Sequence, residues 1–329
     1  QIRTPNLDRL AAEGTRFENA FVTQASCSPS RSSILTGLFP HQNGQLGLSH
    51  YGYRMADGLP NIPRELKNAG YRTGILGKLH VNPGSAFPYD YNGIPHQKTR
   101  DVRLPAEDFA AFLDGQKNEP FFFHMNFVDA HTPLTDQAAG LPEEPLGPDD
   151  VAPWPLLGGD HPTVRKRVAG YYNCVKRVDI GVGLVLQELE KRDLTQNTLV
   201  IFVGDHGPPF CRGKTTCYES GLAVPMIVRW PAQISPGQVH PELVSTVDLL
   251  PTFCEAGGAP IPPGAAGASM LPLMVSDSGT QSWRQTILAE WTTHGPLNYY
   301  PMRSIRDRRY KLIHNLVAGE RENPTKGVD

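Results

Sequence analysis

The sequence lacks any long hydrophobic run, and this absence bears first on its relation to membranes. The longest apolar stretches, residues 199–203 and 121–123, have the length of buried strands and fall far below the ~18 residues that a spanning helix needs. Charge of either sign is also not in excess, because 31 lysines and arginines face 33 aspartates and glutamates, for a net charge of −2. The sequence therefore predicts neither a membrane span nor the basic face of a nucleic-acid-binding protein.

Cysteine is scarce, and its number is odd. The five cysteines stand at irregular spacing, which argues against a disulfide framework and leaves at least one thiol unpaired. The sequence leaves open whether Cys211 and Cys217 pair with each other. Glycine and proline are plentiful instead: 32 and 31 residues make 63 of 329, close to a fifth, so we expect many ordered turns and long loops.

The remaining composition is that of a large globular chain. With 329 residues, 39% of them hydrophobic, it suits about two domains or one large α/β domain. The chain opens on Gln1 rather than Met, directly before a helix signal, and stops without a closing element. We therefore expect the natural polypeptide to continue at both ends, so the lack of a signal peptide says nothing about secretion.

Apolar spacing predicts helices that alternate with strands. Residues 133–162 are rich in proline, glycine and acidic side chains, which predicts a long surface loop. The alternation favours an α/β fold with a mostly parallel sheet covered on both faces. Strands are expected over residues 15–22, 71–76, 121–127, 198–203 and 224–230, and helices over residues 4–14, 29–36, 62–69, 164–194 and 244–255.

Three of the expected strands end in polar, chemically capable side chains. In parallel sheets, ligands bind beyond the carboxyl ends of the strands, so these side chains are candidates for one common site. The pairs are Lys78 and His80, Asp129 and His131, and Asp205 and His206.

A fourth candidate stands at the start of an expected helix. Cys27 lies at the amino end, where unpaired N–H groups and the helix dipole favour an anion. Arg31 follows four residues later on the same face, and its planar guanidinium suits a tetrahedral oxyanion. The bare pattern is better explained by a buried cysteine ahead of a helix-initiating proline, but the serines crowded around it favour a functional role.

These residues carry a resemblance to a known family. Residues 27–37, CSPSRSSILTG, resemble the signature of the sulfatases, in which the cysteine is oxidised to formylglycine after translation. The stretches 4–8, 70–78 and 204–207 are similar to sulfatases as well, and the resemblance runs from Thr4 to about Asn315. Within the family it is strongest to the heparan N-sulfatase branch, the sulfamidases, through residues 41–44, 179–189 and 300–304.

The resemblance implies a fold and a reaction. It implies an alkaline-phosphatase-like α/β sandwich, with a catalytic domain over residues 1–284 and the start of a small C-terminal α+β subdomain over residues 285–329. It also implies hydrolysis of a sulfo group from a carbohydrate, most specifically the N-sulfo group of glucosamine in heparan-type glycans. A formylglycine-generating enzyme is then a transient partner, and the compartment is lysosomal, periplasmic or secreted.

The resemblance also assigns roles to single residues. A hydrated aldehyde at position 27 offers one hydroxyl to attack sulfur and a second whose deprotonation expels sulfate. Lys78 is implied to bind sulfate oxygens, and His80 to assist the attacking hydroxyl. His131 is implied as a sulfate ligand and as proton donor to the leaving nitrogen or oxygen. Apart from the resemblance, a surface lysine beside a structural histidine explains Lys78 and His80 better.

Metal and substrate ligands complete the expected site. The implied cation, Ca²⁺ or Mg²⁺, is held by Cys27 as formylglycine, by Asp205 and by His206, which stands where asparagine is common in the family. Lys214 is implied as a second cation on the sulfo group, a role for which Arg212 competes. In the sulfamidase-like segment, His294 and Arg303 are candidates for binding the sugar.

The resemblance points to one shortfall. Sulfatases supply two further metal ligands as a paired aspartate upstream of the segment that matches residues 4–8, and this chain begins inside that lead-in. A hard cation that prefers six or more oxygens would be under-coordinated, so we expect residues 1–329 alone to bind calcium weakly and to turn over poorly.

Alternative functions remain open at this point. One is an O-sulfatase acting on another sulfated sugar, and another is a phosphonate or phosphodiester hydrolase on the same scaffold. A third is a sugar-binding homologue without catalysis, which an unmodified Cys27 in a host with the modifying enzyme would favour. The oligomeric state and the identity of the sugar are not predicted.

Overall fold

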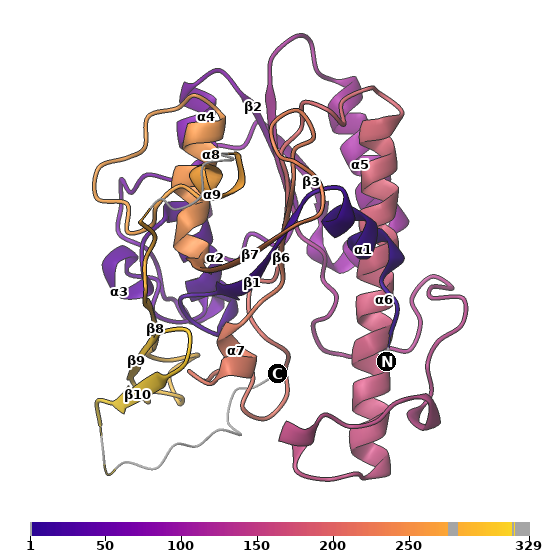
Figure 1. Cartoon of the computed structure of the whole chain (residues 1–329), viewed down its shortest axis with the longest axis vertical. Coiled ribbons are helices and arrows are strands. Elements are labelled where there is room, and N and C mark those ends of the chain that lie inside the picture. Colours follow the sequence, from indigo (N-terminus) through magenta and orange to yellow (C-terminus); the bar gives the residue numbers. More distant parts are fainter. Residues whose placement is uncertain (1, 276–281, 318, 320–329) are drawn as a thin grey trace.

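The computed structural model describes residues 2–275, 282–317 and 319, and these residues form helices and strands in alternation (Figure 1). The helices are α1 (Pro5–Ala12), α2 (Cys27–Thr36), α3 (Pro40–Asn43), α4 (Ile62–Asn68), α5 (Arg103–Asp114), α6 (Pro162–Glu190), α7 (Glu219–Leu222), α8 (Leu249–Ala256) and α9 (Leu271–Val275). The strands are β1 (Thr15–Phe21), β2 (Arg72–Gly77), β3 (Tyr91–Pro95), β4 (Phe121–Met125), β5 (Val200–Val203), β6 (Met226–Arg229), β7 (Gln238–Ser245), β8 (Ile287–Trp291), β9 (Met302–Arg306) and β10 (Lys311–Asn315).

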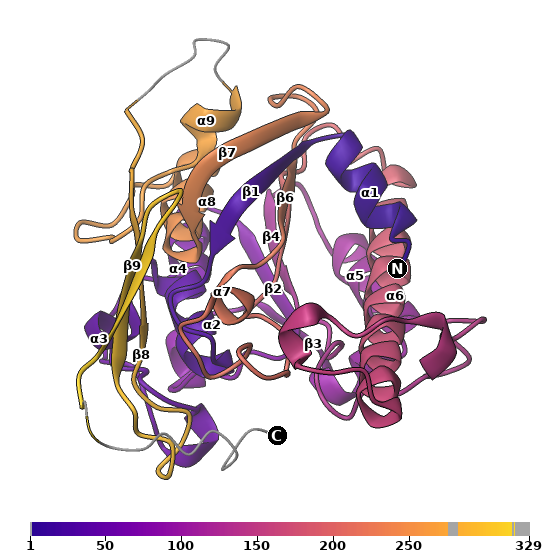
Figure 2. The same ribbon diagram turned by 60° about the horizontal axis from the view of Figure 1, so that its bottom comes forward.

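The strands form three sheets. In the order β3-β2-β4 both pairs are parallel, with Gly74 opposite both Tyr91 and Phe123. In the order β5-β6-β1-β7, β1 is parallel to β7, whereas β6 is antiparallel to both β1 and β5. The third sheet, β10-β9-β8, is antiparallel throughout. It lies at one edge of the molecule, on the left in both views (Figures 1 and 2).

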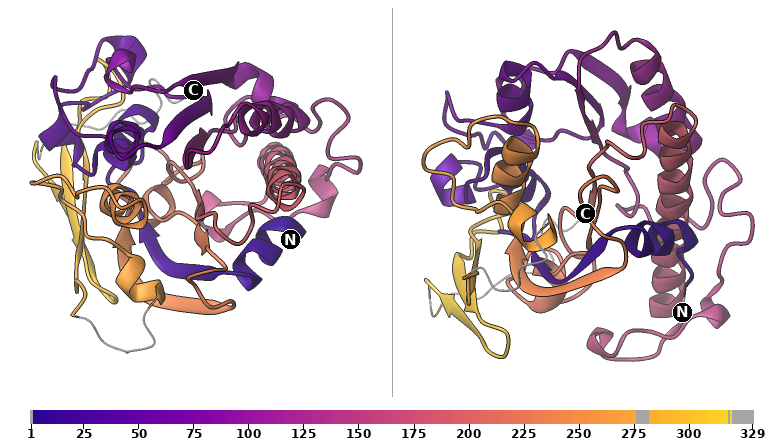
Figure 3. Two further views of the ribbon diagram at one scale, coloured as in Figure 1. Left: turned by 90° about the horizontal axis from the view of Figure 1, so that it is seen from above. Right: turned by 45° about the horizontal axis from the view of Figure 1, so that its top comes forward.

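Helices cover both faces of the first two sheets, which gives three layers (Figure 3). Side chains of α1, α5 and α6 pack on one face, where the ring of Phe112 is tilted by 51° against that of Phe123 of β4, with 4.7 Å between the ring centroids. Helices α4 and α8 pack on the other face, where Phe253 meets Phe122 edge-on at 5.4 Å. Successive side chains of a strand point to opposite faces, so the apolar run in β4 serves both cores.

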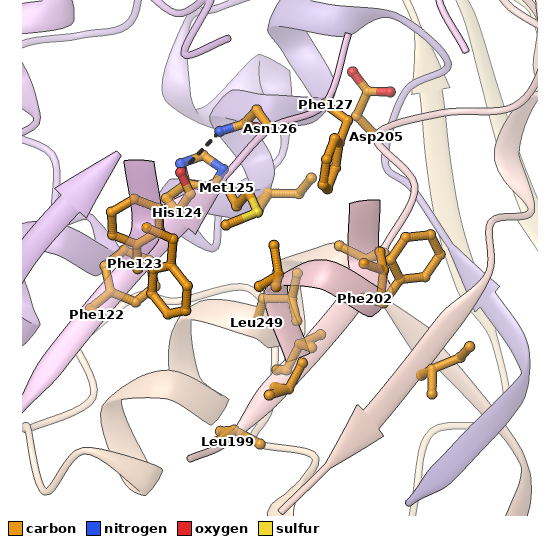
Figure 4. A pocket seen from close by; sticks show the side chains of 18 of the residues that line it. Phe122, Phe123, His124, Met125, Asn126, Phe127, Leu199, Phe202, Asp205 and Leu249 are labelled. Atoms are coloured by element: carbon orange, nitrogen blue, oxygen red, sulfur yellow. Dashed lines mark hydrogen bonds between the residues drawn. The ribbon is translucent and has the colours of Figure 1, made fainter. Parts of the chain in front are cut away.

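A large cavity separates the two central sheets. It has a volume of about 1230 Å³ and is lined mainly by apolar side chains from residues 121–127, next to β4, and residues 199–203, next to β5. Among the described residues, β4 and β5 are each the edge strand of their sheet on this side. Figure 4 shows the lining, with Leu199 and Leu249 toward one end and Asn126 and Asp205 at the other. The two sheets therefore meet across a cavity rather than through a strand pair.

Most of the expected elements are confirmed. Helix α1 begins at Pro5 after Thr4, and α2 ends where Gly37 takes the left-handed conformation with a φ of 66°. Residues 133–162 form a loop with two short 3-10 turns, and no described helix is long and apolar enough to cross a membrane.

The expected helix start at residue 244 is wrong. Val244 and Ser245 belong to β7, because they pair with Ala20 and Phe21 of β1. Helix α8 therefore begins only at Leu249. Helix α5, strand β3 and most of β7 were not predicted. The domain boundary at residue 284 stays a prediction. Residues 318 and 320–329 of the predicted C-terminal subdomain lie outside the described residues.

Candidate active site

The site is built around the buried amino end of α2. Ser26 precedes the helix in an extended conformation, and Cys27 is its first residue, with only 2% of its surface exposed. The helix is buried although it is rich in hydroxyls, because Ser32, Ser33 and Thr36 each donate to a main-chain carbonyl one turn earlier. The sequence thus permits a helix N-terminus inside the protein, where its N–H groups favour an anion.

Arg31 joins this helix to the ends of three strands. Its Nε donates to Asp205 Oδ2, beyond β5, at 2.9 Å. Its Nη1 donates to the carbonyl oxygen of Lys78, beyond β2, and to Asn126 Oδ1, beyond β4, each at 2.6 Å. The guanidinium has five N–H donors in a fixed plane, so one side chain sets the relative positions of these strand ends.

Cys27, Asp205 and His206 form a compact group of possible metal ligands. Their ligand atoms all lie within 4.8 Å of one another, and Cys27 Sγ is 3.3 Å from His206 Nε2. His206 Nδ1 lies 2.7 Å from the carbonyl oxygen of Gly207, which only accepts, so Nδ1 carries a proton, and Nε2 is the nitrogen whose lone pair the neutral ring would offer to a metal ion. A carboxylate, an imidazole lone pair and the atom at position 27 suit a divalent cation.

Charges within the group shift its pKa values. Burial alone would raise the pKa of the Cys27 thiol, but the charge of His206 and hydrogen bonds with His131, His206 and His80 hold it well below its ordinary value. Burial likewise opposes ionisation of Asp205, yet the charges of His206 and Arg31 lower its pKa. The pKa of His206 is raised despite burial, because Asp205 and Cys27 favour its cation.

A cavity of about 370 Å³ lies over Cys27. Lys78 and Lys214 both line it, and burial lowers the pKa of Lys78, with the charge of Lys214 acting in the same direction. His131 lies at its edge, and because its Nδ1 donates to the carbonyl oxygen of Thr132 at 2.7 Å, Nε2 is left for the cavity. The lining residues are Cys27, Leu48, His50, Gly77, Lys78, Leu79, His80, His96, His131, Lys214 and His294. Two ammonium groups and a helix N-terminus make the cavity suited to an anion.

The structure brings most of the residues predicted from the sequence to this cavity. Cys27, Lys78, His80, His131 and Lys214 line it directly. Their roles stay predictions, because only their proximity is established here.

The two sugar-binding candidates lie in different places. His294 lines the cavity but is 98% buried, and its Nδ1 lies 2.8 Å from Ser26 Oγ. Arg303 does not line the cavity. Its guanidinium, on β9, instead pairs with Glu290 at 3.4 Å and donates to the carbonyl oxygen of Met302. Its predicted contact with substrate has no support from this placement.

Several site residues were not predicted. Asn126, which accepts from Arg31, stands just beyond β4, the same strand-end signal that revealed His131. His50 and His96 line the cavity from two short 3-10 helices, Ser49–Tyr51 and His96–Arg100. The His50 ring stacks on His80, with Nδ1 3.0 Å from His80 Nε2. No local pattern marks these two histidines, since only the tertiary fold brings them to the cavity.

Comparisons with known proteins find relatives over almost the whole chain. The sulfatase family model matches residues 1–259, and the model of the N-sulphoglucosamine sulphohydrolase C-terminal region matches residues 204–322. The chain is 36% identical to human (Homo sapiens) N-sulphoglucosamine sulphohydrolase over 96% of its own length and 69% of the human protein. It is 33% identical to an ulvan-active sulfatase of Formosa agariphila, over 97% of this chain and 62% of that protein.

Solved structures share the fold. A protein in complex with its substrate D-glucosamine-2-N,6-O-disulfate has a TM-score of 0.77 and 20% identity, over 97% of this chain and 85% of that chain. The phosphonate monoester hydrolase of Silicibacter pomeroyi has a TM-score of 0.79 and 22% identity, over 95% of this chain and 82% of that chain. At these identities the likeness concerns the fold alone, and it confirms the expected alkaline-phosphatase-like sandwich.

His294 predicts a pH dependence of stability. Burial, with the charge of Lys214, lowers its pKa to about 3, against ~6.5 in an unfolded chain. Between these values the unfolded state binds a proton that the folded state does not, so the free energy of unfolding falls as pH falls through this window, by about 1.4 kcal/mol per pH unit. Urea denaturation at pH 5 to 6.5 should show a shallower pH slope for His294→Gln. The exposed His314→Gln variant is the control, and equal slopes in the two variants would contradict the assignment.

The ligand group predicts an order of metal affinity. Asp205 is the one carboxylate among the three clustered ligands, so we expect unmodified polypeptide 1–329 to bind Ca²⁺ with a Kd of about a millimolar or weaker. Zn²⁺, which accepts thiolate, imidazole and carboxylate, should bind more tightly, and His206→Gln should weaken it by about tenfold or more. Calorimetric titration measures both, with Cys27 confirmed as a thiol by mass spectrometry. Stoichiometric micromolar Ca²⁺ binding would refute this order.

Proposed function

This chain belongs to the sulfatase family of hydrolases, and from that premise we propose that it removes the N-sulfo group of a glucosamine residue in a heparan-type glycan. The main observation in support of this proposal is the cavity over Cys27, which suits an anion because Lys78 and Lys214 lie in its wall. The choice of sugar is supported by the 36% identity to a human enzyme named for this substrate and by the C-terminal model match over residues 204–322.

The family generally uses formylglycine and a divalent metal, and we assign both to this site. The oxidised residue is Cys27, which requires a formylglycine-generating enzyme as a transient partner. Asp205, His206 and residue 27 would hold the cation, Ca²⁺ or Mg²⁺, since their ligand atoms converge within 4.8 Å. Together the two groups supply a geminal diol as nucleophile beside a positive charge.

The chain's own cations receive the substrate. Burial lowers the pKa of Lys78, and the charges of Arg31 and Lys214 act in the same direction. A sulfo group placed between the two ammonium groups would offset this repulsion. Because the cavity is partly enclosed, the attraction is stronger than between the same groups in water. Lys78 and Lys214 would thus bind the substrate and stabilise the charge that grows on its oxygens.

Histidines in the cavity handle protons. An amine leaves poorly as an anion, so cleavage of the N–S bond needs a proton on the nitrogen. His131 presents Nε2 to the cavity, because its Nδ1 is held by the carbonyl oxygen of Thr132. We assign His131 as that donor. His80, also in the wall, lies on the side of Cys27 and would assist its hydroxyl.

Two alternatives within hydrolase chemistry keep some support. An O-sulfatase activity fits the same cavity, and the ulvan-active relative, whose name denotes another polysaccharide, is 33% identical. The likeness to a phosphonate monoester hydrolase concerns the fold only. A lysosomal, periplasmic or secreted location follows from the proposed polysaccharide substrate.

Sulfate release tests the proposal. The full polypeptide, with divalent cation present and formylglycine confirmed by mass spectrometry, is assayed on N-sulfoglucosamine and on glucosamine 6-sulfate. We expect release from the first, reduced by about 10³-fold or more in Cys27→Ser, which lacks the nucleophile.

Each other outcome has a distinct meaning. Release from glucosamine 6-sulfate alone would retain a sulfatase and discard the N–S specificity. Faster turnover of a phosphonate monoester than of either sulfated sugar would favour the phosphonate hydrolase. His314→Gln, a substitution at an exposed residue of β10 outside the cavity wall, serves as the control.

A further inference from the structure

A buried charge cluster lies behind His131, outside the cavity wall. The Asp129 side chain has no exposed surface, and two arginines from distant segments bind it. Arg177 of α6, also fully buried, donates from Nε to Asp129 Oδ2 at 2.6 Å. Arg100 donates from Nη1 to Asp129 Oδ1 at 2.8 Å. Neither guanidinium is among the residues that line the 370 Å³ cavity.

The same arginines also hold the main chain that follows Asp129. Arg100 Nη2 donates to the carbonyl oxygen of His131 at 3.3 Å, and its Nη1 donates to that of Pro133 at 3.1 Å. Arg177 Nη1 donates to the carbonyl oxygens of Thr135 and Asp136 at 3.1 and 3.2 Å. Residues 129–136 contain no helix or strand, so these bonds replace the regular hydrogen bonds that would otherwise fix the segment.

Such a cluster is a costly way to stabilise a loop. Burying three charges removes them from water, and apolar packing of similar volume is often as stabilising. The arrangement does offer geometric precision, because each planar guanidinium bonds a carboxylate and main-chain oxygens at once. The segment held in this way carries His131, which we assigned above as the proton donor to the leaving nitrogen.

We propose that Arg100 and Arg177 are positioning residues, which act through Asp129 and the main chain of residues 131–136 to place His131 Nε2 for proton transfer. This inference rests on the proposed function. In the step concerned, the hydroxyl oxygen at position 27 would bond to sulfur as the N–S bond breaks, the N–S electron pair goes to the leaving nitrogen, and that nitrogen receives the Nε2 proton of a doubly protonated His131 ring, which keeps its Nδ1 proton on the carbonyl oxygen of Thr132. A displacement of about 1 Å in such a donor costs on the order of 10²-fold in rate.

Substrates with different leaving groups separate positioning from simple destabilisation. An amine leaving group needs the proton, whereas 4-nitrophenolate leaves without one. In Arg177→Lys, one ammonium group cannot bridge Asp129 and the two carbonyls. We expect kcat on N-sulfoglucosamine to fall about 10²-fold, and kcat on 4-nitrophenyl sulfate to change by less than about threefold. His131→Gln should show the same split, and the partly exposed Arg100→Lys should repeat it if Arg177→Lys fails to fold.

Arg229→Lys is the matched control. Arg229 of β6 is also fully buried and pairs with Glu13 at 2.8 Å, away from the cavity wall. Its substitution should affect the two substrates equally. An equal loss on both substrates in the Arg177 and Arg100 variants would overturn the inference, as would full activity on both.

Amide hydrogen exchange provides a test that does not depend on turnover. The N–H of His131, which donates to the carbonyl oxygen of Val128 at 2.9 Å, should lose protection in Arg177→Lys and keep it in Arg229→Lys, since only the first removes donors that hold the carbonyls of this segment. Unchanged protection in Arg177→Lys would refute the positioning role whatever the substrate. If the wild-type protein cleaves neither substrate while protection is lost as expected, the proposed function fails and the structural part of the inference stands.

Discussion

The bonds made by Arg31 are the interaction on which the site depends. A single guanidinium, 9% exposed, reaches Asp205, the carbonyl oxygen of Lys78 and Asn126, which follow strands from two different sheets. Between these sheets lies the large cavity, so no strand pair sets their separation among the described residues. Arg31 lies one helical turn from Cys27 on α2. Its hydrogen bonds therefore fix the position of Cys27 relative to the ends of these strands.

Burial of the α2 amino end gives the site its electrostatic character. The unpaired N–H groups, Lys78, Lys214 and Arg31 all bring positive potential, while Asp205 is already paired with Arg31. The pKa values respond to this charge and to burial: those of Lys78 and His80 are lowered, and that of the Cys27 thiol is lowered as well. The cavity over Cys27 therefore stabilises a bound anion. A metal cation can bind beside these positive charges only together with anionic ligands.

Local patterns in the sequence predicted much of this site because its residues follow strands or begin a helix. Lys78, His131 and Asp205 each stand just beyond an apolar run, and the fold brings the ends of those runs together. The end of β7 and the start of α8 were predicted wrongly. The spacing of apolar residues around Val244 is helical, but Val244 pairs with β1 and is therefore held in a strand. His50 and the pair of Arg303 with Glu290 depend on contacts between segments far apart in the chain, which no local period encodes.

Precision in the site comes from groups that do not touch substrate. His206 and His131 each donate Nδ1–H to a carbonyl oxygen one residue later, and this leaves Nε2 of His206 toward Cys27 and Nε2 of His131 for the cavity. The orientation is useful only if the main chain itself is held, and the carbonyls of His131 and Thr135 are held by the partly exposed Arg100 and the buried Arg177. Removal of one arginine leaves the buried carboxylate of Asp129 with a single arginine partner. The first structural consequence is therefore a change in the loop of residues 129–136, and the cavity changes only through that loop. Under our proposal the reaction therefore depends on residues such as Arg177 as well as on the cavity wall, because a proton donor is only as well placed as the main chain that carries it.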